Sequence, residues 1–412
     1  MGFFGQDFPN ILILSFGAMS IGLILAYFSP ASQTITQEFT LSLNEQSTFN
    51  ALAPISAIFG GIFVGIIMSK LGRKLTAAMS SFIVLIGWVL LFFSQKSSKI
   101  MIFVSRIVSG IAAGATSGVT PVYISELSPN ELRGSYGVMN QLFVSIGAMV
   151  SYFIGIFFNW RQIALFSSIP SLIVVLGIFV VPESPVTVNL DEKIGEESLW
   201  QAKFSKQILI SVFLVVFQQL SGINAILTNL TPIFKASKIS FSPGVAATLV
   251  GAAQVITTAI ASPMVEKLGR KKSWVLSVSG QSIFLVLLWA NHQFFNSTIL
   301  PVVCLFFDVF MFGIGLGPLP WFVVPELFPD SVRSFACSII QALNWLLCSS
   351  LIYLFNEMVK LMTIGWVYFF YGIIMCLAIL FGLYILPETK GQDMGGENKK
   401  SDSRKIPLNV EL

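Results

Sequence analysis

The stretch Lys70-Leu-Gly-Arg-Lys74 stands between two long apolar runs, and it returns as Lys267-Leu-Gly-Arg-Lys271 between two more. Two further pieces repeat in the same order: Glu126, Pro129 and Arg133 return as Glu326, Pro329 and Arg333, and Pro182-Glu-Ser184 returns as Pro387-Glu-Thr389. Three local matches in one order indicate an internal duplication. We therefore expect two halves of similar structure.

The apolar runs indicate that this chain lies in a membrane. Of its 412 residues 55% are hydrophobic and only 11% are charged, against roughly 25% charged in an average soluble domain. Runs of about 20 apolar residues, each able to cross roughly 30 Å of hydrocarbon, fall near residues 10–29, 48–68, 75–94, 100–123, 134–157, 162–181, 207–230, 243–265, 273–292, 298–324, 333–356 and 364–386. Helices satisfy every backbone amide without water, whereas barrel strands would be shorter and would alternate in polarity. The sequence predicts an all-α membrane protein with twelve transmembrane helices in two six-helix bundles.

The predicted organisation follows from the duplication. We expect an N-terminal six-helix half over residues 1–181, a linker over 182–206, a C-terminal half over 207–386 and a tail over 387–412. The linker is polar, which is typical of a solvated connection. The first apolar run lacks a basic flank and a small-residue cleavage site, so we expect it to remain as the first helix.

The basic residues predict the orientation. If both termini are cytoplasmic, the inner loops carry twelve Lys and Arg residues and the tail carries five, whereas the outer loops carry six. This excess obeys the positive-inside rule. Because the basic residues are scattered over short loops, nucleic acid is not an expected partner. The four cysteines lie inside apolar runs without paired spacing, which supports neither a disulfide framework nor a metal site.

Five motifs carry a family resemblance. They are Pro121-Val-Tyr-Ile-Ser-Glu126 with Arg133-Gly134, Pro182-Glu-Ser-Pro185, Gln218-Gln-Leu-Ser-Gly-Ile-Asn224, Gly317-Pro-Leu-Pro-Trp321 and Pro387-Glu-Thr-Lys-Gly391. Together they resemble the sugar porter family of the major facilitator superfamily, which includes animal facilitative glucose transporters and insect trehalose transporters. The resemblance runs from the first helix to the tail and implies the major facilitator fold.

Amide side chains are the expected sugar contacts. They donate and accept hydrogen bonds and so match neutral hydroxyls, and the Ser221-Gly222 step weakens the helix beside them, as in the broken helices where transporters place substrate. The resemblance places sugar contacts at Gln141, Gln218, Gln219, Asn224, Gln254, Trp321 and Asn344. A single buried Gln is more often a packing residue of membrane helices, but the cluster with Gly favours a site. An isolated Trp near a helix end is often an interface anchor.

Charged residues at the cytoplasmic helix ends predict a gate. By the resemblance, ion pairs tie the two halves together when the inner side is closed, and they would use Arg73, Glu126, Arg133, Glu266, Arg270, Glu326 and Arg333. The alternative is positive-inside topology with the glutamates as counter-ions.

The sequence departs from the family pattern at several places. The family usually has Asp at Ser69, Arg at Val186, two Tyr at Thr228 and Asn229, and a polar or acidic residue at Gly313. The linker is also shorter than the family's intracellular helical domain. Reduced or altered transport is a consequence to test.

Two predicted helices bear on whether transport is coupled to protons. Proton-coupled members of the family place an Asp in the first helix near an Arg on the fourth, but residues Ile11 to Tyr27 include no acid although Arg106 is present. This favours facilitated diffusion. An acid at membrane depth is a functional candidate. Asp308 lies toward the outer half of its helix, so we favour a side chain in a wet vestibule, or one that snorkels to the interface, over a proton carrier.

The sequence thus predicts a facilitative transporter of a hexose or a trehalose-like saccharide that works by alternating access, with a monomer sufficient. It predicts no enzyme, cofactor or metal, a plasma-membrane location and glycosylation of Asn296 in an outer loop. Three alternatives remain open: a non-transporting sugar receptor, a proton-coupled symporter, and a carrier for another polyol.

Overall fold

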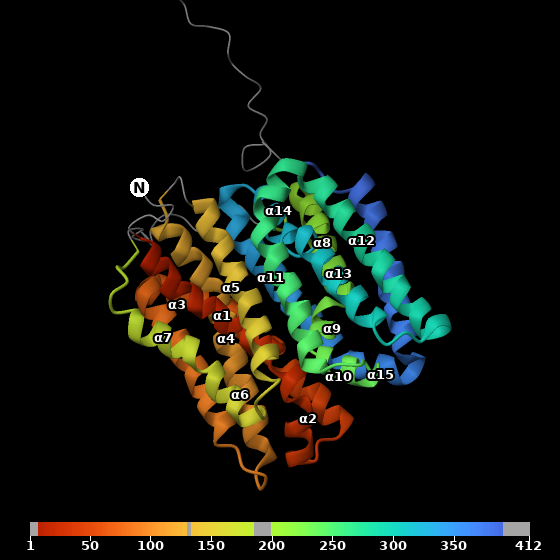
Figure 1. Cartoon of the computed structure of the whole chain (residues 1–412). Helices are drawn as coiled ribbons and strands as arrows, with labels where there is room; N and C mark the ends of the chain where they lie inside the picture. Colours follow the sequence, from red (N-terminus) through yellow and green to blue (C-terminus); the bar gives the residue numbers. More distant parts are fainter. Residues whose placement is uncertain (1–6, 130–132, 185–198, 390–412) are drawn as a thin grey trace, which may run out of the picture.

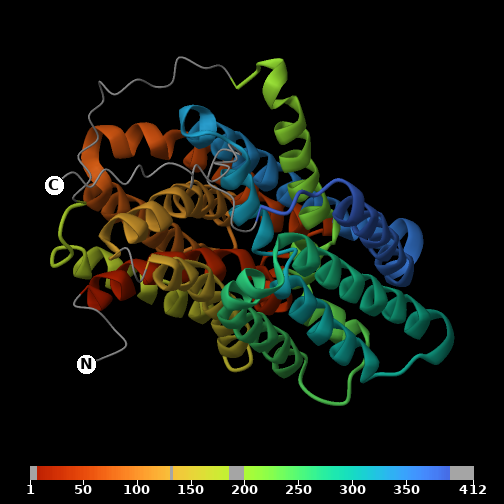
Figure 2. The ribbon, with the colours of Figure 1, turned by 90° about the horizontal axis from the view of Figure 1, so that it is seen from above.

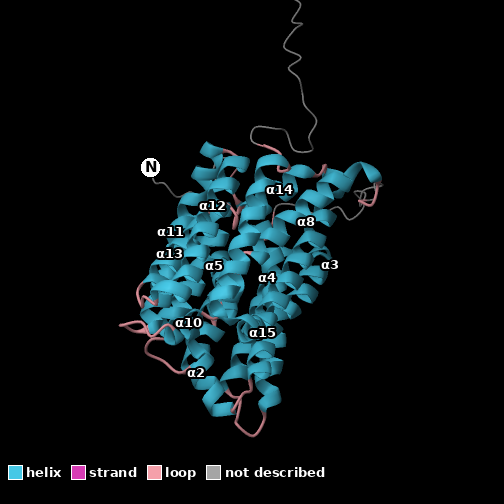
Figure 3. Cartoon of the chain, turned by 90° about the vertical axis from the view of Figure 1, so that its right-hand side faces the viewer, coloured by secondary structure: helices cyan, strands magenta, loops and turns pink. Residues whose placement is uncertain are grey.

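The chain folds into helices that lie roughly along one direction (Figure 3). The structure is a computed structural model, and it describes residues 7–129, 133–184 and 199–389. The first half contains α1 (Phe8–Ala26), α2 (Phe28–Phe39), α3 (Leu43–Phe92), α4 (Lys99–Leu127), α5 (Arg133–Ile154), α6 (Trp160–Ser167) and α7 (Ile169–Gly177). The second contains the 3-10 helix η1 (Ala202–Phe204), α8 (Ser205–Leu220), α9 (Ile223–Leu227), α10 (Leu230–Ala236), α11 (Pro243–Leu268), α12 (Arg270–Ala290), the π-helix η2 (Asn291–Phe295), α13 (Leu300–Ile314), α14 (Leu319–Leu327) and α15 (Asp330–Tyr384).

Ten helical segments of the described part are long and apolar enough to cross a membrane. Two of them, Leu43–Phe92 and Phe335–Tyr384, have 50 residues each, and 50 helical residues span about 75 Å, more than twice a bilayer core. Each is interrupted once, at Gly72 (φ 79°) and at Thr363 (φ 65°), and so crosses twice. The prediction of twelve transmembrane helices is confirmed.

Prolines move two of the predicted helix boundaries. The first helix was expected to end near residue 29, but a second helix, α2, follows directly and continues to Phe39 with Pro30 in its first turn, where a missing N–H costs nothing. The run at 162–181 is likewise split into α6 and α7, with Pro170 at the start of α7.

The periphery is apolar. Side chains such as Phe82, Ile283 and Leu377, each well inside a long helix, are more than half exposed. Patches of this kind are costly in water and are expected against lipid tails. Buried small polar residues lie between the helices instead, as Ser20 does against Ser171 (3.1 Å between the hydroxyl oxygens).

We call the face at which α1 begins and α15 ends the terminal face, and the opposite one the far face. In Figure 1 the terminal face is at the top, with the first half (red to yellow) mainly on the left and the second (green to blue) mainly on the right. Figure 2 views the molecule from this face. Between the halves, α5 packs against α11 and α3 against α15.

The repeated motifs build the same turn in both halves. Gly72 and Gly269 have positive φ angles of 79° and 87°, and a helix starts directly after each. At the first turn, Glu183 accepts from the backbone N–H groups of Arg73 (3.0 Å) and Lys74 (3.1 Å). At the second, Glu388 accepts from those of Arg270 (2.9 Å) and Lys271 (3.1 Å). The carboxylates satisfy N–H groups that a helix leaves without internal partners.

Candidate functional site

The helix that begins with α8 is broken inside its apolar run. α8 ends at Leu220, Gly222 has φ 78°, and α9 begins at Ile223. A Cβ at Gly222 would lie 2.3 Å from the Tyr371 ring, so neither the backbone conformation nor the space admits a side chain. The break predicted at the Ser221-Gly222 step is present.

A second break faces the first. α13 ends at Ile314 and α14 begins at Leu319, which releases backbone carbonyls from helical bonding. The Gln218 side chain donates through Nε2 to the carbonyl oxygens of Gly317 (2.7 Å) and Leu316 (3.2 Å). Irregular backbone at membrane depth requires such partners, so Gln218 holds the two breaks against each other.

The predicted amides form short chains of hydrogen bonds. Asn344 Nδ2 donates to Gln218 Oε1 (2.7 Å), and Asn224 Nδ2 donates to Gln219 Oε1 (2.8 Å). Gln254 Oε1 and Asn140 Oδ1 are buried and have no hydrogen-bond partner in the described structure. Buried amide oxygens are normally satisfied, so these two are unsatisfied acceptors on residues that line the cavity described next.

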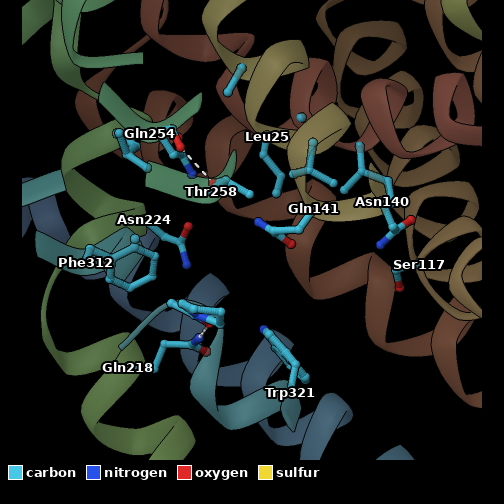
Figure 4. Close-up of a pocket in the computed structure, with 18 of the residues that line it drawn as sticks. Leu25, Ser117, Asn140, Gln141, Gln218, Asn224, Gln254, Thr258, Phe312 and Trp321 are labelled. Atoms are coloured by element: carbon cyan, nitrogen blue, oxygen red, sulfur yellow. Dashed lines mark hydrogen bonds between the residues drawn. The ribbon is translucent and has the colours of Figure 1, made fainter. Parts of the chain in front are cut away.

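These side chains line one cavity of about 480 Å³ between the halves. All seven predicted sugar contacts line it: Gln141, Gln218, Gln219, Asn224, Gln254, Trp321 and Asn344. None of the described residues that line it is charged. Figure 4 shows Gln141 and Asn140 reaching the space from one half and Asn224, Gln218 and Trp321 from the other.

Sequence reasoning missed several polar lining residues, among them Asn140, Thr258 and Gln341. Helical spacing could have found the last two, because Thr258 follows Gln254 by four positions and Gln341 precedes Asn344 by three, which puts each pair on one helix face. This spacing could not have found Asn140, because adjacent residues such as Asn140 and Gln141 do not share a helix face.

The cavity opens toward the terminal face. Its lining includes Pro121, near the end of α4, and Gly137, near the start of α5, while Gln141 is exposed and Trp321 is 36% exposed. Such partial exposure of Trp321 fits a ring that borders a solvent-filled entrance.

Hydrogen bonds between the halves close the far side. Ser29 Oγ accepts from the Thr231 backbone N–H (3.0 Å), and its hydroxyl lies 3.2 Å from Thr231 Oγ1. Further bonds across the seam among the described residues include Lys235 to Gln33 (2.9 Å), Asn356 to Ser47 (2.9 Å), Ser145 with Thr258 (3.0 Å) and Tyr152 to the Leu227 carbonyl (2.9 Å). The structure therefore has the cavity open on the terminal side and closed on the far side.

Two ion pairs between described residues of the terminal face each lie within one half. Arg73 pairs with Glu126 (2.9 Å) and Arg270 with Glu326 (2.6 Å). Arg333 Nε donates to the carbonyl of Pro325 (2.9 Å), and the side chains of Arg133 and Glu266 lie outside the described residues. Because the predicted latch between halves belongs to a state with this side closed, it stays a prediction.

Arg106 is held by backbone groups. Its guanidinium, 1% exposed, donates to the carbonyls of Ile24 (3.0 Å) and Phe49 (3.3 Å). It also lies 5.2 Å from the centroid of the Phe49 ring, a cation-π contact. Carbonyls and a ring thus contact the guanidinium, whereas its Nη1 is buried and has no hydrogen-bond partner among the described residues.

The structure shows the surroundings of two unusual residues, Gly313 and Asp308. A Cβ at Gly313 would lie 2.2 Å from Thr257 Oγ1, so the close contact of α13 with α11 excludes the side chain that the family usually has there. Asp308 is 0% exposed. The expectation of a wet vestibule or a snorkelling carboxyl at Asp308 was wrong, because this side chain points between helices. Val186 lies outside the described residues.

Comparison with known proteins agrees with this geometry. The family model described as Sugar (and other) transporter matches residues 12–198 and again residues 187–397. The chain belongs to this family. Sugar transporter ERD6-like 18 of Arabidopsis thaliana is 32% identical, with 91% of this chain and 87% of the relative covered. Facilitated trehalose transporter Tret1 of Bombyx mori is 27% identical, with 95% and 86% covered.

Solved structures match over almost the whole chain. A crystal structure of a D-xylose-proton symporter has a TM-score of 0.81 at 25% identity and covers 94% of this chain and 100% of its own. The xylose transporter XylE from E. coli in an inward-open conformation has a TM-score of 0.81 at 24% identity, covering 94% and 98%. The likeness to the latter concerns the fold alone. The predicted family and the major facilitator fold are confirmed.

Proposed function

We propose that this chain carries a neutral sugar through the membrane by facilitated diffusion, in alternating access between its two faces. The observation that carries the proposal is the uncharged cavity at the seam, in which amides from both halves converge and two amide oxygens, on Gln254 and Asn140, have no protein partner. Amides match hydroxyls as both donors and acceptors.

The coupling mode rests on Arg106. Two of its nitrogens donate to backbone carbonyls and the guanidinium contacts an aromatic ring, and the first helix, residues 11–27, contains no Asp or Glu to pair with it. A proton gradient then has no group on this route by which to drive the sugar. The family resemblance implies an Asp in the first helix of proton-coupled members, and because none stands there in this sequence, a facilitative carrier is the simpler mechanism.

We infer a hexose or a trehalose-like disaccharide as the solute. One relative is named a trehalose transporter, and the ring of Trp321 at the entrance offers an apolar face on which a pyranose can stack. A flux assay in proteoliposomes, with unlabelled glucose, trehalose and inositol competing against labelled sugar, selects the solute. Competition by inositol alone would contradict the sugar assignment.

The sharpest variant is Gln254→Ala. Because Gln254 Oε1 has no protein partner, its removal takes a contact from the sugar without leaving another protein group unsatisfied. Loss of one hydrogen bond worth about 0.5–1.5 kcal/mol weakens sugar affinity roughly 2- to 13-fold. Gln293→Ala, in the exposed η2 segment away from the cavity, is the matched control.

The outcomes separate the rival functions. Equal affinities of the two Gln variants would contradict the placement of the sugar. Binding without flux in correctly inserted protein would select a sugar receptor, and sugar-dependent proton uptake would select a symporter.

We further propose that the terminal face is cytoplasmic in a plasma membrane, as the excess of basic residues in its loops supports. Asn296 is exposed on the far face, whereas Asn229, which begins a second sequon, Asn229-Leu-Thr231, is 5% exposed. Glycosidase treatment should therefore shift the wild-type band and the Asn229→Gln band but not the Asn296→Gln band. Glycan loss in Asn229→Gln alone would contradict this arrangement.

A further inference from the structure

A carboxyl group lies inside the second half, away from the sugar cavity. Asp308 of α13 is 0% exposed, and neither of its carboxylate oxygens has a hydrogen-bond partner in the part of the chain that the structure describes. It does not line the cavity, although Phe312, one turn along the same helix, does. A lone ionised carboxylate in such surroundings is very costly.

The helices around Asp308 offer no cation. α13 packs against α11 and α12, and residues 243–265, 273–291 and 361–386 contain no Asp, Glu, Lys or Arg. The titratable groups that interact with Asp308 are Cys304 on its own helix and Tyr368 on α15. Neither supplies a positive charge, so an ion pair cannot stabilise the anion.

The side chain beside Asp308 is a second buried polar group without partners. Gln281 of α12 is 0% exposed, and both Nε2 and Oε1 lack a hydrogen-bond partner. α12 packs closely on α13 at this level, where Ser277 Oγ donates to the Met311 carbonyl (2.6 Å). Gln281 is within hydrogen-bonding reach of the Asp308 carboxyl. Native interiors rarely leave polar atoms of two adjacent side chains unsatisfied, so their chemistry should be mutually complementary.

One protonation state makes them complementary. A protonated carboxyl can donate its O–H to Gln281 Oε1 while its carbonyl oxygen accepts from Nε2, giving two hydrogen bonds. An ionised carboxylate has acceptors only, so Gln281 Oε1 would remain without a donor. The neutral acid thus satisfies the pair, and the anion does not.

We propose that Asp308 and Gln281 form a proton-binding site within the second half. Asp308 takes one proton from water, becomes a neutral acid and pairs with the Gln281 amide, which joins α12 to α13 a short distance before the break that precedes α14. The proton stays in this half, separate from the solute. The site does not depend on which sugar the cavity binds.

Infrared spectroscopy of the purified full-length protein in lipid tests the site without any sugar. The wild type at neutral pH should have the carbonyl stretch of a protonated carboxyl. This band should be lost in Asp308→Asn and kept in Glu357→Gln, a matched variant of an exposed acid. In Gln281→Leu the band should move to higher wavenumber, because the carbonyl loses its amide donor.

Each of these spectra tests a separate part of the proposal. A wild-type spectrum without the band at neutral pH, or a band that survives Asp308→Asn, overturns the proposal. A band that does not move in Gln281→Leu overturns the pairing. If Asp308→Asn fails to insert, the wild-type band and its shift in Gln281→Leu still test whether Asp308 is protonated and paired with Gln281. Sugar flux, measured separately, reports on the cavity and can fail while this site stands.

Discussion

Gly222→Ala should destabilise the protein by an amount that the structure lets us work out. Gly222 has φ 78°, and a residue with a Cβ in a left-handed conformation costs about 1–2 kcal/mol. The new Cβ would lie 2.3 Å from the ring of Tyr371, which is 0% exposed, and overpacking of a buried site adds about 1–3 kcal/mol. The sum is a loss of roughly 2–5 kcal/mol.

The chain provides a matched control for this change. Gly65 lies inside α3, and a Cβ there would meet nothing within 4 Å. Gly65→Ala should therefore be neutral or stabilise by about 0.5–1 kcal/mol, since Ala is the better helix former. Thermal unfolding of both purified variants, followed as loss of the monodisperse peak, gives the comparison. If Gly222→Ala melted together with Gly65→Ala, the positive φ and the ring contact could not be what limits this position.

Three further perturbations test the gate and the far face. With Cys348, which lines the cavity, as the sole cysteine, Glu326→Ala should lower its labelling from the far face by weakening the closed terminal side; unchanged labelling from both faces would exclude a latch. In the same background Ser29→Ala, which removes the bonds to Thr231 (3.0 and 3.2 Å), should raise far-face labelling, and no rise would mean that these bonds do not hold the seam. The Ser42 backbone N–H and the Lys99 ammonium hold the pKa of Glu45 below its ordinary value. A lowered pKa contributes stability above the ordinary value that is lost as the pH falls through the lowered one, so the gap in melting temperature between wild type and Glu45→Gln should be present at neutral pH and shrink in acid. A gap that persists in acid would contradict this assignment.

The helices were predictable because their signal is local. Each apolar run reports its own length, and the bilayer fixes the length required. The break at Gly222 was also predictable, since only glycine adopts its backbone angles readily. The ends near Pro30 and Pro170 were harder to place, because a proline can either end one helix or begin the next.

The sequence predicted which kinds of side chain line the site, but it predicted their contact partners less well. The amides were expected from their chemistry and from the family resemblance, and the structure brings them to one cavity. Asp308 was misplaced because a sequence gives depth along a helix but not the face that the side chain occupies. The partners of Arg73 and Arg270 could not be assigned to the same half or the opposite one, since that depends on how the two bundles are tilted.

The absence of charge among the residues that line the cavity has an electrical consequence. Moving one elementary charge across a membrane involves about 2.3 kcal/mol per 100 mV, but a neutral sugar in an uncharged cavity moves none. The loaded carrier should therefore be silent in voltage-clamp recordings, and membrane potential should neither speed nor slow it. Net uptake would then continue only until the sugar concentration is equal on the two sides, so the metabolism that consumes the sugar would set the direction of flow.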